Sequence, residues 1–230
     1  MARYILTDIE GTTTSITFVH DVLFPYAKAH LRVWVEAHAG EARVADLLAG
    51  MKAHAYRAHG AAWTDADCIA QLLAWIDEDR KEPALKTLQG WIWADGYHSG
   101  AYTSHVYPDV KPALARWKDA GLTLGVYSSG SAEAQDLLFG HTVDGDLRPF
   151  FSHYFDTQVG HKREVGSYHN IQKALGIPAG DILFLSDIPE ELDAAAAAGM
   201  QVCHLLRPGT QAVERYAGVP DFAAIDDALL

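Results

Sequence analysis

The sequence has few cysteines, few positive charges and no long apolar run, and each shortage narrows the class of protein. Cys68 and Cys203 are its two cysteines; because they are too few for a disulfide framework, we expect a reducing, cytoplasmic setting. Lys and Arg number 18 against 30 Asp and Glu, for a formal net charge of −12, which argues against nucleic-acid binding. No stretch approaches the roughly 20 apolar residues that cross a bilayer, so we expect no membrane partner.

What the sequence does contain is typical of a globular protein. Hydrophobic residues make up 49% and charged residues 21% of 230 residues, enough for a sizeable core in one domain or one domain with an insertion. The negative charge still allows a small anionic ligand, because one lysine and a bound metal ion reverse the sign of the local field.

The middle of the chain has a helical pattern. From about residue 21 to residue 102, apolar residues recur at three- and four-residue spacing, and no strand pattern interrupts them. Thr64 is expected to cap one helix, since acidic residues follow it in the first turn. Pro83 suits the first turn of the next helix.

Beyond residue 108 the pattern alternates between helices and short apolar strands. We expect helices at 110–120, 132–139, 168–175 and 189–198, and strands at 122–127, 153–155, 182–185 and 202–205. Such alternation indicates a parallel sheet covered on both faces. The strand pattern at 4–6 should join this sheet, because a lone strand is not stable. We therefore predict an α/β, doubly wound, Rossmann-like core of residues 1–15 and 104–230, with an all-helical cap inserted at 16–103.

Two carboxylates follow the first strand. Asp8 and Glu10 stand one residue apart, and alternation along an extended chain sends their side chains to the same side. Gly11 then permits a sharp turn. Such a pair can hold a divalent cation, attack an electrophile with one carboxylate and move protons with the other. Two solvated acids at a strand end have the same pattern, so the interpretation depends on what accompanies the pair.

Further polar residues stand at or just after later strand ends. They are Ser128 and Ser129, Lys162 in the loop after residue 155, and Asp187. The serines also fit a turn with a helix cap, the lysine a solvated surface and Asp187 a helix entry. Because the carboxyl ends of parallel strands share one edge of a sheet, we expect these residues to meet Asp8 there.

Together these residues supply what phosphoryl transfer needs. A cation held by Asp8 and Asp187, with Lys162 opposite, would neutralise a phosphate monoester, and oxygen ligands favour Mg²⁺. The two serines would donate hydrogen bonds to the phosphoryl oxygens. Asp8 could attack phosphorus to give an aspartyl-phosphate, while Glu10 protonates the leaving oxygen and then deprotonates the attacking water.

A set of short strings covers nearly the whole chain and is more specific than any one of its members. The strings are Asp8-Ile9-Glu10-Gly11-Thr12-Thr13-Thr14, Leu88-Gln89-Gly90, Val106-Tyr107-Pro108-Asp109, Val126-Tyr127-Ser128-Ser129-Gly130-Ser131, Phe139-Gly140-His141, Phe155-Asp156-Thr157, Gly160-His161-Lys162, Phe184-Leu185-Ser186-Asp187 and Arg207-Pro208-Gly209. This pattern resembles the haloacid dehalogenase-like superfamily and, within it, the enolase-phosphatase (acireductone synthase) family of methionine salvage. Glu10 favours that family, because most phosphatases of the superfamily have aspartate there and true dehalogenases have no acid.

The resemblance implies an activity and a set of site residues. The expected reaction converts 2,3-diketo-5-methylthiopentyl-1-phosphate to acireductone, by enolisation and then loss of phosphate. A small phosphorylated diketone is therefore the expected partner, and a monomer the expected state. By resemblance, the metal ligands are the side chains of Asp8 and Asp187 with the backbone carbonyl of Glu10, and the substrate contacts are Ser128, Ser129 and Lys162.

Two assignments stay open. Glu191 matches the second acid of the last superfamily motif and is a candidate for holding metal-bound water, but Glu190 and Asp193 compete with it. The enolisation base is also undecided between Glu10, Lys162 and a histidine of the cap.

The inserted helices are expected to close over the site and exclude water. Aromatic residues that could line a pocket for the methylthio end, although packing within the cap is the stronger expectation for each, are Trp75, Trp91, Trp93, Tyr97 and Tyr102. The histidines of this region, His54, His59 and His98, lack metal-ligand spacing, and we expect surface or core positions for them.

Three other functions fit parts of the pattern. A phosphatase of the same fold could act on another small phosphate ester, although Glu10 and the strings within the cap weigh against it. A phosphotransferase could resolve the same aspartyl-phosphate with a hydroxyl group instead of water. A non-catalytic sensor of phosphorylated ligands should have lost the nucleophile, the lysine or a metal acid, and this chain keeps all of them.

Overall fold

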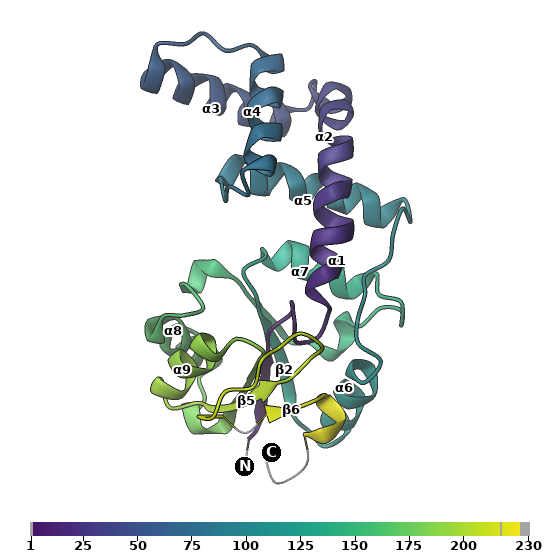
Figure 1. The fold of residues 1–230 in the computed structure, drawn as a ribbon, viewed down its shortest axis with the longest axis vertical. Coiled ribbons are helices and arrows are strands. Elements are labelled where there is room, and N and C mark those ends of the chain that lie inside the picture. The colour runs from purple at the N-terminus through teal and green to yellow at the C-terminus, as the bar shows by residue number, and fades with distance from the viewer. Residues whose placement is uncertain (1, 217, 226–230) are drawn as a thin grey trace. The chain divides into compact units, whose positions relative to one another are not determined.

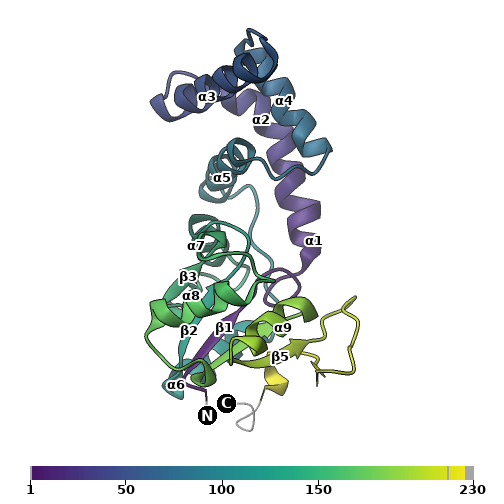
Figure 2. The same ribbon diagram turned by 90° about the vertical axis from the view of Figure 1, so that its left-hand side faces the viewer.

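The structure is a computed structural model that describes residues 2–216 and 218–225. The described residues form two compact units, which are coloured by residue number in Figure 1 and seen from a second side in Figure 2. The core unit falls within Met1–Phe18 and Thr103–Leu230, and the helical unit is Val19–Tyr102. Within the described ranges, no helix combines the length and the apolar character that crossing a membrane requires.

The core unit is built on a parallel sheet. Its described strands are β1 (Tyr4–Thr7), β2 (Thr123–Tyr127), β3 (His153–Phe155), β4 (Ile182–Ser186), β5 (Gln201–Leu205) and β6 (Gly218–Val219). The strand order is β3-β2-β1-β4-β5-β6, and Tyr4 of the central β1 pairs with Thr123 on one side and Ile182 on the other. The order reverses at β1, which is where doubly wound sheets bind ligands. The predicted Rossmann-like α/β core is confirmed.

Alternating side chains of β1 enter two separate apolar layers. Ile5 packs in one cluster with Trp117 and Phe139, whereas Leu6 packs in the other with Tyr168. Helices therefore cover both faces of the sheet, as a parallel sheet requires. Helices α6 (Val110–Asp119) and α7 (Ala132–Gly140) cover the first layer. Helices α8 (Val165–Leu175) and α9 (Pro189–Ala197) cover the second layer and lie side by side in Figure 1. The core unit also contains the short helix α1 (Ile16–Phe18).

Two features of the core unit differ from the expectation. Helix α8 begins at Val165, three residues before the expected start at Tyr168. The residue before it, Glu164, makes no side-chain cap, and Gly166 weakens the helical signal of the first turn. Strand β6 was not expected, because two residues of an irregular segment carry no periodicity.

The helical unit has an apolar core of its own. It contains a π-helix, η1 (Val19–Leu23), and the helices α2 (Phe24–His38), α3 (Ala42–His59), α4 (Asp65–Asp77) and α5 (Pro83–His98). Apolar side chains from all four α-helices form one buried cluster. Thr64 and Asp67 form a reciprocal capping box at the start of α4, and Pro83 opens α5. Both predicted helix starts are confirmed, and none of these described residues lies in a strand.

Candidate active site

The main chain brings three of the candidate residues to the carboxyl edge of the sheet. The amide of Asp8 donates to the carbonyl of Leu185 at 2.9 Å, which extends the pairing of β1 with β4 by one residue. The amide of Ser128 donates to the carbonyl of Phe155 at 3.1 Å in the same way beyond β2. Asp187 directly follows the last residue of β4. The arrangement follows from parallel pairing.

Lys162 is buried against two carboxylates. Its Nζ lies 2.5 Å from Oδ1 of Asp8 and 2.7 Å from Oε2 of Glu191, and 7% of the residue is exposed. Burial alone would lower the pKa of Lys162, but the two carboxylates outweigh it and raise this pKa. The ammonium group is therefore charged at neutral pH and holds one oxygen of the candidate nucleophile.

The Lys162 loop is fixed by residues that the sequence interpretation did not single out. The hydroxyl of Tyr168 donates to the carbonyl of Lys162 at 2.7 Å, and that of Tyr127 donates to the carbonyl of Gly160 at 2.9 Å. Gly160 has a φ of 126°, and a Cβ there would lie 2.2 Å from Oγ of Ser167. The tight turn before Lys162 therefore requires glycine.

We expect Lys162→Met to lower the rate of phosphate release by about 100- to 1,000-fold, because a preorganised positive charge is lost. It should also destabilise the chain by about 3–5 kcal/mol, since Asp8 and Glu191 stay buried without their cation. Adding Glu191→Gln should recover part of this stability in urea unfolding but none of the activity. Wild-type turnover in the double variant would contradict the prediction.

The surroundings of Glu10 shift its pKa upwards. Ser128 Oγ donates to Glu10 Oε2 at 3.3 Å. Burial, and then the charge of Asp8, raise the pKa of Glu10, although Lys162 and Ser128 act in the opposite direction. A raised pKa favours the protonated carboxyl, which is the form that donates a proton to a leaving oxygen.

The serines of the loop at 128–131 make different contacts. Ser131, and not the two serines singled out from the sequence, caps α7 by accepting a hydrogen bond from the amide of Ala134. Ser128 is buried and also accepts from the amide of Gly130 at 3.1 Å, which closes the turn. Ser129 is exposed at the same edge. The helix cap therefore falls on Ser131, whereas Ser128 closes the turn and stays a candidate for phosphate binding together with Ser129.

Asp187 is held through its main chain and its side chain. Oγ1 of Thr12 donates to Oδ1 of Asp187 at 3.2 Å and accepts from the Asp187 amide at 3.1 Å. Nε2 of His204 lies 3.1 Å from the Asp187 carbonyl. A Cβ at Gly11, whose φ is 76°, would lie 2.2 Å from Oδ2. Burial and the charge of Asp8 raise the pKa of Asp187 to about 6.

Of the three acids considered on α9, the structure brings Glu191 to the site. Its Oε2 accepts a hydrogen bond from Oγ of Ser186 at 3.0 Å in addition to its ion pair with Lys162. Burial and the charge of Asp8 raise the pKa of Glu191 to about 7. Glu190 and Asp193 are exposed, and Asp193 forms a separate surface ion pair.

The described part of the chain contains no group of three or more His, Cys, Asp or Glu side chains placed to hold a metal ion. Mg²⁺ does not need such a group, because it commonly uses one or two carboxylates together with waters and substrate phosphate. A cleft of about 480 Å³ opens in the core unit, and the carboxylic acid Asp187 is one of its lining residues. The lining also includes Gly11, Tyr107, Pro189, Arg207 and Gly209.

The aromatic residues of the helical unit mainly pack. Trp75, Trp91 and Trp93 lie against the apolar cluster of that unit, Tyr97 is buried, and the Tyr102 hydroxyl donates to the Trp93 carbonyl at 3.0 Å. The structure therefore favours the packing interpretation.

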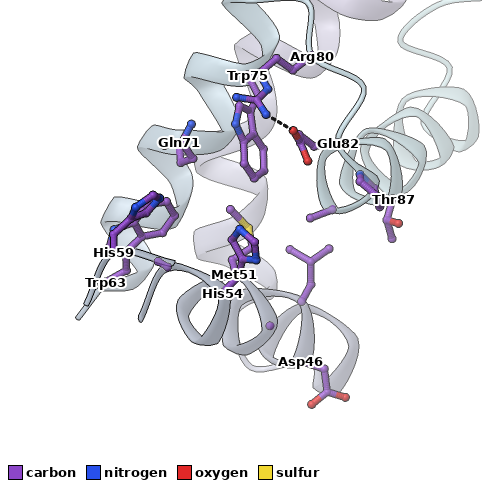
Figure 3. A pocket seen from close by; sticks show the side chains of 15 residues that line it. Asp46, Met51, His54, His59, Trp63, Gln71, Trp75, Arg80, Glu82 and Thr87 are labelled. Carbon is purple, nitrogen blue, oxygen red and sulfur yellow. Dashed lines mark hydrogen bonds and ion pairs between the residues drawn. The ribbon is translucent and has the colours of Figure 1, made fainter. Parts of the chain in front are cut away.

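A separate cavity of about 780 Å³ lies between helices α3, α4 and α5 of the helical unit (Figure 3). Two of the three histidines named from the sequence, His54 and His59, line it together with Trp75. The third, His98, is exposed.

Sequence reasoning gave no role to two residues that contact Asp187. Thr12 belongs to the string Asp8–Thr14, but nothing in that string shows that its hydroxyl holds Asp187. His204 is a polar residue near the end of an otherwise mostly apolar strand, Gln201–Leu205, which is a usable signal for a side chain at the carboxyl edge.

Comparison with known proteins identifies the family of this chain. The model of haloacid dehalogenase-like hydrolases matches residues 2–199. The enolase-phosphatase E1 of Sorangium cellulosum is 55% identical over 209 residues, which cover 91% of this chain and 90% of that protein. The chain belongs to the enolase-phosphatase family. A second member of that family, the enolase-phosphatase E1 of Pseudomonas aeruginosa, is 53% identical over 226 residues, 97% of each chain.

Solved structures share the fold of this chain. The UTR4 protein of Saccharomyces cerevisiae is 34% identical and superimposes with a TM-score of 0.82, covering 98% of this chain and 100% of its own. CbbY of Rhodobacter sphaeroides, at 18% identity and a TM-score of 0.62, covers 97% and 96% and shares the fold. Enolase-phosphatases are hydrolases of the haloacid dehalogenase superfamily, whose phosphatases typically use a divalent metal ion.

Proposed function

We propose that this chain converts 2,3-diketo-5-methylthiopentyl-1-phosphate to acireductone and phosphate in methionine salvage. About half of its residues are identical to those of enolase-phosphatases over nearly the full chain, and this sequence identity supports the reaction. The structural observation that carries the proposal is the buried pair of Asp8 and Lys162 beside the partly buried Glu10, at the carboxyl edge of a doubly wound sheet.

The phosphatase step follows from these side chains. A carboxylate oxygen of Asp8 forms a bond to phosphorus as the bond between phosphorus and the substrate oxygen breaks. Glu10 gives its proton to that leaving oxygen, for which its raised pKa suits it. Glu10 then takes a proton from the water that attacks the aspartyl-phosphate, which releases phosphate and restores the Asp8 carboxylate. Lys162 and the serines at 128 and 129 stabilise the phosphoryl oxygens.

The same edge fits a hard divalent cation. We assign Mg²⁺ to the carboxylates of Asp8 and Asp187 and the backbone carbonyl of Glu10, with Glu191 in the outer shell. Oxygen ligands suit this ion. Burial and the charge of Asp8 raise the pKa of Asp187, and a bound cation would relieve that unfavourable charge. When bound, the ion would neutralise phosphate charge and polarise the substrate carbonyls.

The proposal extends to the rest of the molecule. The helical unit serves as the cap that excludes water from the reacting groups. The chain works as a cytoplasmic monomer on a small phosphorylated diketone. The low number of cysteines and the negative net charge support this setting.

The test supplies the purified chain with 2,3-diketo-5-methylthiopentyl-1-phosphate and follows phosphate release together with acireductone absorbance. We expect both to rise in parallel with Mg²⁺ present and to stop when a chelator removes it. Simple sugar and glycolate phosphates serve as comparison substrates.

Each rival function has a distinct result in this assay. Faster release from a comparison substrate, without acireductone, would move the function to another small-molecule phosphatase. Transfer of phosphate to an added alcohol in place of its release would indicate a phosphotransferase. Binding of the diketone without any turnover by the folded chain would favour a sensor.

A further inference from the structure

Arg207, in the segment after β5, is a buried cation outside the set of residues assigned above. Its exposed fraction is 4%. Nη1 and Nη2 each lie 2.8 Å from a different carboxylate oxygen of Asp109, and Oδ2 of Asp109 also accepts from the amide of Phe222 at 2.8 Å. The guanidinium stands 4.1 Å from the centroid of the Tyr107 ring. A bidentate pair with a stacked ring leaves Arg207 little freedom of position or angle.

The third nitrogen of this guanidinium, Nε, reaches the loop that follows the nucleophile. Nε of Arg207 donates to the main-chain carbonyl of Thr12 at 2.9 Å. The turn closes on itself, because the amides of Thr12, Thr13 and Thr14 all donate to the carbonyl of Ile9. Such internal bonds give the turn its shape but do not fix its place in the fold. The contact from Arg207 ties it to the segment after β5, and the amide of Tyr107, on whose ring Arg207 stacks, donates to the carbonyl of Thr13 at 3.0 Å.

Thr12 links the turn to Asp187, the proposed metal ligand. Its hydroxyl bonds to both the amide and the carboxylate of Asp187, at 3.1 Å and 3.2 Å. Gly11, one residue earlier, approaches the same carboxylate so closely that a Cβ would lie 2.2 Å from it. A small shift of the turn would therefore reorient Asp187, since the carboxylate is in contact with it at two residues.

We propose that Arg207, held by Asp109, is a positioning residue that fixes the Thr12 turn and thereby sets the Asp187 carboxylate for metal binding. The inference rests on the proposed function, in which Asp187 is a ligand of Mg²⁺. It assigns Arg207 an effect on the metal ligand through Thr12 and no direct part in the reaction.

Two variants of the pair and one matched control test this role. Arg207→Lys keeps the charge but loses the fork that bonds Asp109 and Thr12 together. Arg207→Met combined with Asp109→Asn removes the pair without leaving a buried charge unpaired. The control is Arg116→Met, because Arg116 anchors the neighbouring segment by donating to the carbonyls of Phe222 and Ile225.

The measurement is Mg²⁺ affinity by calorimetry on each folded, substrate-free variant, followed by kcat and KM at low and saturating Mg²⁺. We expect the Kd for Mg²⁺ to rise about 10- to 100-fold in both Arg207 variants, as when partners that orient metal ligands are lost. Arg116→Met should keep the wild-type Kd. At saturating Mg²⁺ the Arg207 variants should recover much of their kcat, with the substrate KM little changed.

Failure of this inference differs from failure of the proposed function. Wild-type Mg²⁺ affinity in a folded Arg207→Lys chain would overturn the positioning role while leaving the metal site in place. Equal losses of affinity in the Arg116 control would also overturn it, because they would indicate general destabilisation. If the wild-type chain itself does not bind Mg²⁺, the metal assignment fails and this inference fails with it.

Discussion

Replacing Asp8 with asparagine is expected to reduce phosphate release by about 10,000- to 1,000,000-fold, the range seen when one residue of a hydrolase's catalytic triad is removed. The amide has nearly the shape of the carboxylate but is a far weaker nucleophile towards phosphorus. Phosphate release and acireductone absorbance measure the loss directly. Asp193→Asn is the matched control, because its exposed ion pair lies outside the site, and it should keep wild-type activity.

The Asp8→Asn chain should remain folded, which separates chemistry from stability. The variant loses the ion pair with Lys162, but it also removes a charge that raises the pKa values of Glu10, Asp187 and Glu191. These effects on the free energy of unfolding oppose each other, so urea unfolding should show a modest change. An active Asp8→Asn chain would show that another group attacks phosphorus.

Asp187→Asn is expected to stabilise the metal-free chain at about pH 8 while abolishing its response to Mg²⁺. The pKa of Asp187 is raised from an ordinary value of 3.8 to about 6 by burial, and then by the charge of Asp8. The folded state therefore holds this proton more tightly than the unfolded state does. That contribution to stability is fully present below pH 3.8 and is lost as the pH rises through about 6.

The size of this effect follows from the shift. A change of roughly two pKa units corresponds to about 3 kcal/mol, which the ionised Asp187 costs the metal-free fold above about pH 6. Asparagine avoids this cost near pH 8 and gives little advantage near pH 4. Urea unfolding at both pH values, with chelator and then with excess Mg²⁺, tests the prediction. A metal-free Asp187→Asn chain that is less stable than wild type near pH 8 would contradict it.

The positions of residues that follow paired parallel strands could be predicted from the sequence. Asp8, Ser128 and Asp187 each follow an apolar strand, and strand ends of a parallel sheet share one edge, so their meeting required no tertiary detail. Their roles in catalysis remain proposals. The helix starts at Thr64 and Pro83 were predictable for a similar reason, because caps are local.

Contacts that depend on side-chain direction could not be predicted in this way. Glu190, Glu191 and Asp193 lie within one turn of α9, and their spacing does not show which one faces Lys162. Arg207 was visible only as part of a string, because its contact with Thr12 joins residues that are far apart in the sequence. Strand β6 consists of two residues and exists through its pairing with β5.

The place of β1 in the sheet also constrains the order in which the chain acquires structure during synthesis. Tyr4 pairs with Thr123 and with Ile182, so both neighbours of the central strand are made after the helical unit. That unit is contiguous in the chain and buries an apolar cluster of its own, so it can fold while the strand still lacks partners. The emerging polypeptide therefore carries an apolar segment with unpaired amides and carbonyls until more than half of the chain has been translated.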